Sequence, residues 1–131
     1  MADYVVVHIA CARRRIEQIV LRMNEVKNLG LDPVTVLAAL AHDIRWEALR
    51  MMAGGASIHA TQLAAKFGRD VDGIGKHLRV LKDSGAVDWR AGADARHTLY
   101  FIPERFLPQE SIVDYGFGKF YFPDAPLAVK D

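Results

Sequence analysis

The sequence predicts a mainly α-helical domain with a small β-hairpin, and two features of residues 60–102 carry the prediction. The first is a pair of short helices, one broken at Gly68 and the other ended at Gly85, which is typical of a helix-turn-helix. The second is a pair of β-branched and aromatic runs, 87–90 and 96–102, separated by turn-forming residues. A hairpin directly after the second helix makes the unit a winged helix-turn-helix.

The two helices of this unit are predicted from their breaks and from one apolar stripe. Residues 60–67 form the first helix, because Gly68 is free to take the left-handed conformation that ends helices. Asp70 follows, and its carboxylate is expected to cap the second helix, 71–84. Apolar residues recur in that helix at steps of three and four, which predicts one buried face. This face consists of Val71, Ile74, Leu78 and Leu81.

Two more helices are predicted before this unit. Asp32 and Pro33 are typical of a helix start, with Asp32 as the N-cap and Pro33 in the first turn. A second helix is expected from about 43 to 53, where two glycines end it. Its inward side is expected to include Trp46, Leu49 and Met52. Residues 57–59 are expected to add a short strand beside the wing.

The chain after the wing is predicted to be irregular and then to form a second small hairpin. A single turn is expected at 103–108, followed by strands at 112–115 and 119–122 around residues 116–118. The tail from Pro123 is polar and contains proline, which predicts a loose end.

The N-terminal residues lie outside this predicted core. Residues 4–11 fit either a strand or the first turns of a helix, since the run is both apolar and β-branched. Residues 13–29 are predicted to be helical, with Gly30 as the stop. The apolar stripe of this helix fits either contact with its own domain or a dimer interface. The stripe consists of Ile16, Ile19, Val20, Met23 and Val26.

Three stretches, in this order and spacing, are similar to a known family. They are 39–50, 62–64 and 77–87, the last beginning His77-Leu78 and ending Gly85-Ala86-Val87. They resemble the ArsR/SmtB family of winged-helix transcriptional repressors, over about half of the chain. The resemblance implies a homodimer that binds double-stranded DNA at an inverted repeat. We therefore divide the chain into an N-terminal dimerisation segment (1–31), a winged helix (32–107) and a C-terminal extension (108–131).

Helix 71–84 is the element expected to read DNA. A projection at 100° per residue leaves a polar face opposite its buried stripe, and such a helix fits the major groove. The expected DNA contacts lie on this helix, beside its start and in the wing: Arg69, Asp72, Gly73, Lys76, His77, Arg79, Arg90, Arg96 and His97. The alternative function is a protein-interaction module that presents the aromatic segment 115–122 to a partner.

The overall composition is compatible with a DNA-binding protein but does not by itself indicate one. The net charge of the 131-residue chain is only +1, so any DNA-binding charge must be local. The single cysteine, Cys11, excludes an internal disulfide and is typical of a reducing cytoplasm. No apolar run reaches the length of a membrane span, so no membrane partner is expected.

Metal and enzyme chemistry are not predicted. Where the resembling family places a sensor pair of thiolates, this chain has His59 and Thr61, and its histidines show no metal-ligand spacing. Ser57 and His59 are neighbours, but no carboxylate is placed to complete a triad. We therefore expect no metal, no cofactor and no enzymatic activity, while the sequence leaves any small-molecule effector unidentified.

Overall fold

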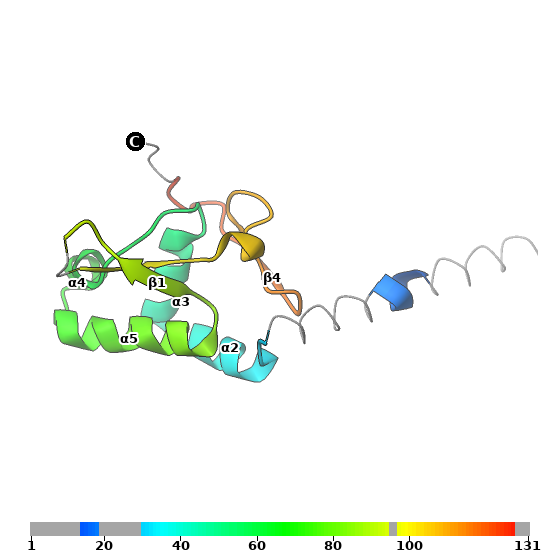
Figure 1. The fold of residues 1–131 in the computed structure, drawn as a ribbon, viewed down its shortest axis with the longest axis horizontal. Coiled ribbons are helices and arrows are strands. Elements are labelled where there is room, and N and C mark those ends of the chain that lie inside the picture. Colours follow the sequence, from blue (N-terminus) through cyan, green and yellow to red (C-terminus); the bar gives the residue numbers. More distant parts are fainter. Residues whose placement is uncertain (1–13, 19–29, 95–96, 128–131) are drawn as a thin grey trace, which may run out of the picture.

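The computed structural model describes residues 14–18, 30–94 and 97–127 (Figure 1). Within residues 30–127, four helices come first, followed by two hairpins with a 3-10 turn between them. In chain order the elements are α2 (Pro33–Leu40), α3 (Asp43–Met52), α4 (Ala60–Phe67), α5 (Val71–Ser84), β1 (Asp88–Ala91), β2 (Thr98–Phe101), η1 (Glu104–Phe106), β3 (Ile112–Asp114) and β4 (Lys119–Tyr121). This is the predicted winged helix-turn-helix, mainly α with a small antiparallel β-hairpin as its wing.

The helix-turn-helix forms at the predicted residues. Gly68 ends α4 with φ of 61°, and Gly85 ends α5 with φ of 88°, both in the left-handed region that glycine tolerates. The predicted role of the Asp70 carboxylate is wrong. Asp70 occupies the N-cap position, but its exposed side chain makes no capping hydrogen bond, so water is left to solvate it.

The buried stripe of α5 fixes this helix against the rest of the domain. Ile74, Leu78 and Leu81 have no solvent exposure. Val71 was predicted to share their face but is 43% exposed, because it lies in the first turn and lines an open depression beside the wing. The helical phase is therefore correct, while the buried face begins one turn later than predicted.

The starts of α2 and α3 explain how these helices are placed. The Asp32 carboxylate accepts a hydrogen bond from the backbone N–H of Thr35 at 3.2 Å, and Pro33 opens α2, as predicted. His42 caps α3, since its Nδ1 accepts from the backbone N–H of Ile44 at 3.2 Å. Of the predicted inward residues of α3, Leu49 and Met52 are fully buried, whereas Trp46 is partly exposed.

The wing is an antiparallel pair in which Trp89 lies opposite Tyr100 and Arg90 opposite Leu99. The predicted short strand beside it is a single β-bridge, in which Ile58 and Tyr100 exchange backbone hydrogen bonds of 2.9 and 2.7 Å. This bridge ties Ile58, two residues before the start of α4, to the wing strand β2. It therefore fixes the wing relative to the helix-turn-helix.

The second hairpin belongs to the core of the domain. Tyr115 is fully buried, and the centre of its ring lies 5.0 Å from that of Phe106. Its hydroxyl donates a hydrogen bond of 2.9 Å to the Ala86 carbonyl. Burial raises the pKa of the Tyr115 hydroxyl. Phe122 is also buried and lies against Trp46. The idea that the aromatic segment 115–122 is a partner surface is therefore wrong for its buried aromatic residues, although Tyr121 is exposed.

The predicted loose tail is also wrong as far as Leu127, the last described residue. The Asp124 carbonyl accepts a hydrogen bond from Arg50 Nη1 at 2.6 Å. A Cβ added at Gly54 would lie 2.1 Å from the Pro126 carbonyl oxygen, so the tail backbone runs directly over the end of α3. These contacts with α3 hold the tail where the sequence shows only a polar, proline-containing end.

Much of the N-terminal prediction falls outside the described residues. Residues 14–18 are helical, and Ile16 is 60% exposed. Residues 4–11 and the stripe residues Ile19, Val20, Met23 and Val26 are not described, so both interpretations of the stripe stay predictions. Within the described part of the chain, no helix is long and apolar enough to cross a bilayer.

Candidate nucleic-acid interface

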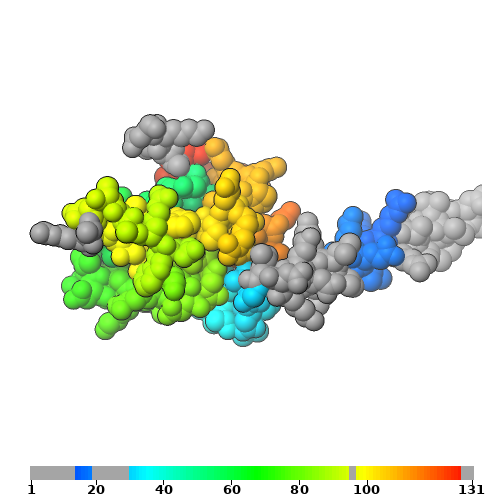
Figure 2. All heavy atoms as spheres, in the orientation of Figure 1, coloured from blue at the N-terminus to red at the C-terminus, as the bar shows by residue number. Residues whose placement is uncertain are grey.

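The outward face of α5 carries the polar residues that the sequence placed there. Asp72, Lys76, Arg79 and Asp83 are all exposed, on the side opposite the buried stripe. Figure 2 shows α5 and the wing side by side on one face of the molecule. This face offers donors and acceptors on a helix that the core holds rigidly.

Gly73 and Gly75 leave two positions on or beside this face without a side chain. A Cβ added at Gly73 or Gly75 would meet no heavy atom within 4 Å, so packing within the domain does not require glycine at either position. Each glycine costs about 1 kcal/mol of helix stability relative to alanine. The missing side chains leave the helix backbone open to close approach from outside.

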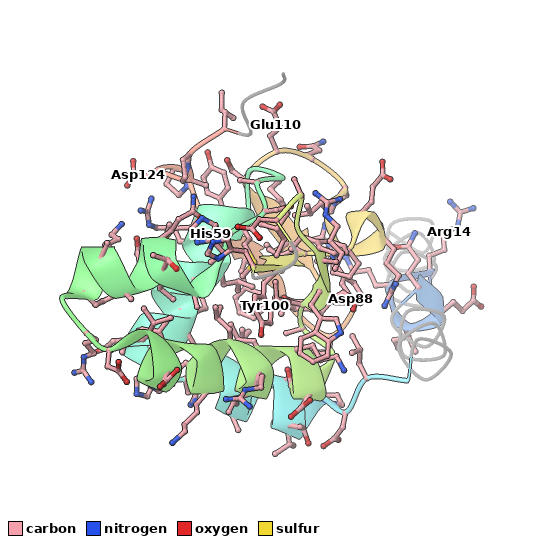
Figure 3. All side chains as sticks on the ribbon, turned by 60° about the vertical axis from the view of Figure 1, so that its left-hand side comes forward. Arg14, His59, Asp88, Tyr100, Glu110 and Asp124 are labelled. Atoms are coloured by element: carbon pink, nitrogen blue, oxygen red, sulfur yellow. The ribbon has the colours of Figure 1, made fainter. Side chains whose placement is uncertain are left out.

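A depression of about 240 Å³ separates the first turns of α5 from the wing. Its walls include Asp72 and Arg79 from α5, His97 from the wing, and His59 before α4. The rings of His59 and His97 lie 5.2 Å apart, and Figure 3 shows the labelled His59 close to the wing. His59 Nδ1 is buried without a hydrogen-bond partner in the described structure. His59 was not predicted to lie in the interface, because its position there depends on the β-bridge between its neighbour Ile58 and Tyr100.

The wing residues differ in how freely they can reach outward. Arg90 donates a hydrogen bond from Nη2 to Ser57 Oγ at 3.1 Å and lies 5.3 Å from the Phe101 ring centre. His97 is exposed, with Nε2 3.9 Å from the Asp94 carboxylate. Arg96 falls outside the described residues. Of these three predicted contacts, Arg90 is therefore held along the wing, while His97 borders the depression beside α5.

The opposite flank of α5 contains a cluster of basic and imidazole groups. The His77 ring lies 4.3 Å from the His42 ring, and its Nδ1 lies 3.5 Å from Arg45 Nη1. Arg45 is itself fixed by a 2.6 Å hydrogen bond from Nε to the Ala39 carbonyl. Burial lowers the pKa of His77, and electrostatic interactions with His42, Arg45 and Arg69 lower it further. The sequence placed Arg69 and His77 in the interface but did not bring His42 and Arg45 to them.

A carboxylate on α3 forms one ion pair within its own helix and one with α4. Glu47 pairs with Arg50 at 2.6 Å and also with Lys66. Hydrogen bonds from Arg50 and then Lys66 lower the pKa of Glu47 to about 2 against the opposing effect of burial. Lys66 is therefore engaged within the domain. Among the described residues, no group of three His, Cys, Asp or Glu side chains is arranged to hold a metal ion.

Comparison with known proteins gives only structural likenesses. No family model matches the chain, and no curated protein is similar to it. A structure of HlyU from Vibrio cholerae N16961 is 23% identical over 53% of this chain and 72% of its own, with a TM-score of 0.47. A structure of reduced HlyU from the same organism is 21% identical over 61% and 78% of the two chains, with a TM-score of 0.47. At this identity neither structure assigns a ligand or an activity to the present chain.

Proposed function

We propose that the protein is a sequence-specific DNA-binding transcriptional regulator that reads the major groove with α5 and contacts the backbone or minor groove with the wing. One observation carries the proposal: an exposed polar face on α5, held by a fully buried stripe and flanked by a wing. An α-helix fits the major groove, and lysine and arginine are suited to guanine and phosphate. Lys76 and Arg79 are the central candidates.

The charge pattern of α5 favours selective over indiscriminate binding. Asp72 and Asp83 share the exposed face with Lys76 and Arg79, so the net attraction of this face for phosphates is small. A carboxylate accepts a hydrogen bond from the amino group of cytosine, and Asp72 in the first turn is suited to this role. Affinity should therefore depend on base sequence more than on total charge.

We also infer that the regulator is a homodimeric repressor acting at an inverted repeat. The family resemblance and the apolar surface of α2 support this inference. Val34 is 74% exposed and Leu37 is 46% exposed, so the outward side of α2 presents apolar side chains that are suited to burial in an interface. A twofold dimer of this kind sets its two reading helices about 34 Å apart on one face of the duplex.

Salt dependence of binding to double-stranded DNA tests the proposed function. A protein that neutralises about three phosphates loses about fortyfold in affinity when salt rises from about 50 to 200 mM. We expect a loss of this order, measured by fluorescence anisotropy with a labelled duplex. An affinity for DNA that is absent at low salt, or insensitive to salt, would contradict the proposal and favour an interaction module.

A further inference from the structure

The flank of α5 that faces α3 gathers arginine and histidine side chains from several elements, whereas the reading face mixes basic residues with aspartates. Arg69 comes from the turn before α5, His77 from α5 itself, Arg45 from α3, and His42 from the residue that caps α3. The contacts between His77 and both His42 and Arg45 show that three elements bring these groups together. Such a gathering of like charges is unfavourable unless the groups stay neutral or meet an anion.

This cluster opens to the outside through a depression of about 300 Å³ at the start of α5. Arg69, Asp70, Gly73, Ile74 and His77 line it. Gly73 leaves the entrance clear, because a Cβ there would meet nothing within 4 Å. Asp70 is the one carboxylate among the described lining residues, and it is exposed at the rim without a capping hydrogen bond. The depression is thus an accessible site with a cationic wall next to the proposed reading face.

We propose that this depression receives a phosphate group of the DNA backbone, bound directly by Arg69 and His77 and supported by Arg45 and His42. The proposal rests on the proposed function and adds a contact and a regulatory property to it. A phosphate at this position would face two groups that can donate charge-assisted hydrogen bonds, of which His77 does so best when protonated. DNA binding is therefore coupled to protonation of His77.

The direction of this coupling follows from the groups around His77. In the free protein, His77 faces His42 and Arg45 on the α3 side and Arg69 and Asp70 in the turn. Burial and these neighbouring cations hold its pKa below the usual 6.5. A bound phosphate adds negative charge and raises the pKa of His77 again. Affinity for DNA is then highest below the pKa that His77 has in the free protein. It falls as pH rises through the higher pKa that His77 has in the complex.

The size of the effect is set by the change in pKa on binding. Each unit by which DNA raises the pKa of His77 makes binding about tenfold tighter at low pH than at high pH. The variant His77→Gln keeps a polar side chain but cannot become charged. We expect its affinity to match wild type near pH 8 and to fall increasingly below that of wild type as the pH is lowered toward 5.5.

The experiment measures affinity between about pH 5.5 and 8 for wild type, His77→Gln and His8→Gln, with a duplex recovered by selection from a random pool. His8 is not among the predicted DNA contacts and serves as the histidine control. We expect His77→Gln to lose most of the pH dependence and His8→Gln to retain it. If His77→Gln keeps the wild-type slope, or His8→Gln removes it, the inference is overturned.

A second measurement covers the case in which His77→Gln does not fold. NMR titration of the wild-type His77 ring, free and with the same duplex, should give a higher pKa in the complex. An unchanged or lower pKa would overturn the inference while leaving DNA binding intact. Failure of wild type to bind any duplex would instead remove the proposed function and this inference with it.

Discussion

Lys76 is the residue at which the proposed function can be tested with least effect on the fold. Its side chain is exposed and opposite the buried stripe of α5, so Lys76→Ala should change the free energy of unfolding by less than about 0.5 kcal/mol. A lost base contact should weaken DNA binding by about 1–3 kcal/mol and relax preference at one position in each half-site. Affinity measurements and thermal unfolding of the same samples give both values.

The matched control for Lys76 is Lys119→Ala, because Lys119 is an exposed lysine on β4 and lies outside the proposed interface. It should leave DNA affinity unchanged at moderate salt. Equal affinities for Lys76→Ala and wild type would remove Lys76 from the interface, and a large loss of stability would contradict its exposed position.

Gly73 and Gly75 give the second prediction at the scale of single residues. Alanine fits at either position, so each substitution should raise the free energy of unfolding by up to about 1 kcal/mol. If DNA approaches the helix backbone closely, Gly73→Ala should nevertheless weaken binding. Urea unfolding and DNA affinity, measured together, separate the two effects.

Gly54→Ala is the contrasting control for these glycines. Its new Cβ would collide with the Pro126 carbonyl, so this variant should be destabilised. A stabilised Gly73→Ala variant that binds DNA as tightly as wild type would show that the open backbone has no role in recognition.

At the scale of elements, Glu47 joins α3 to α4 and makes stability depend on acid pH. Its pKa is lowered from 4.5 to about 2, so its contribution is complete above about pH 4.5 and is lost as pH falls toward 2. Because Lys66 is partly exposed, we expect about 1–2 kcal/mol rather than the full value of the shift. Glu47→Gln should therefore be less stable than wild type at pH 7. Its free energy of unfolding should fall less than that of wild type when the pH is lowered from 4.5 to 3.

Urea unfolding at pH 7 and pH 3 measures the contribution of Glu47. Glu110→Gln, an exposed glutamate in the loop before β3, is the control and should behave as wild type. If Glu47→Gln unfolds as wild type does at both pH values, the ion pairs of Glu47 contribute nothing measurable to stability.

Local patterns predicted the elements well, while contacts between distant elements decided the features that were missed. Glycine stops and helical spacing located α4 and α5, because those signals act within a few residues. Val71 has the right spacing for the core, yet its burial depends on what lies opposite the first turn. Likewise, the sequence pattern predicted the strands β3 and β4, but the hydrogen bond from Tyr115 to Ala86 depends on tertiary packing. The His42–Arg45–His77 cluster was missed for the same reason.

At the scale of the whole molecule, assembly is the prediction that depends on the N-terminal stripe. Replacing Ile19 and Met23 together by glutamate would place two charges in an apolar interface, which costs several kcal/mol unless they reach water. We expect wild type to be a dimer and the double variant to be a monomer with greatly reduced affinity for an inverted-repeat duplex. Light scattering and DNA binding measure the two consequences.

Leu127→Glu is the control for assembly, because Leu127 is an exposed apolar residue in the tail, remote in sequence from the stripe. It should remain dimeric. If the double variant is also dimeric, the interface lies elsewhere. If wild type is monomeric and its N-terminal amides are protected from exchange, the stripe packs within its own domain and the dimer should be abandoned.

Selection of bound fragments from a random pool of double-stranded DNA tests the central claim most directly, because it asks whether this surface reads sequence at all. We expect wild type to enrich one motif of two inverted half-sites, centred about 10 base pairs apart, as a twofold pair of α5 helices requires. Lys76→Ala should enrich a motif with one degenerate position in each half-site. A wild-type pool that stays random after repeated rounds at low salt would contradict the claim that α5 is a sequence-reading helix.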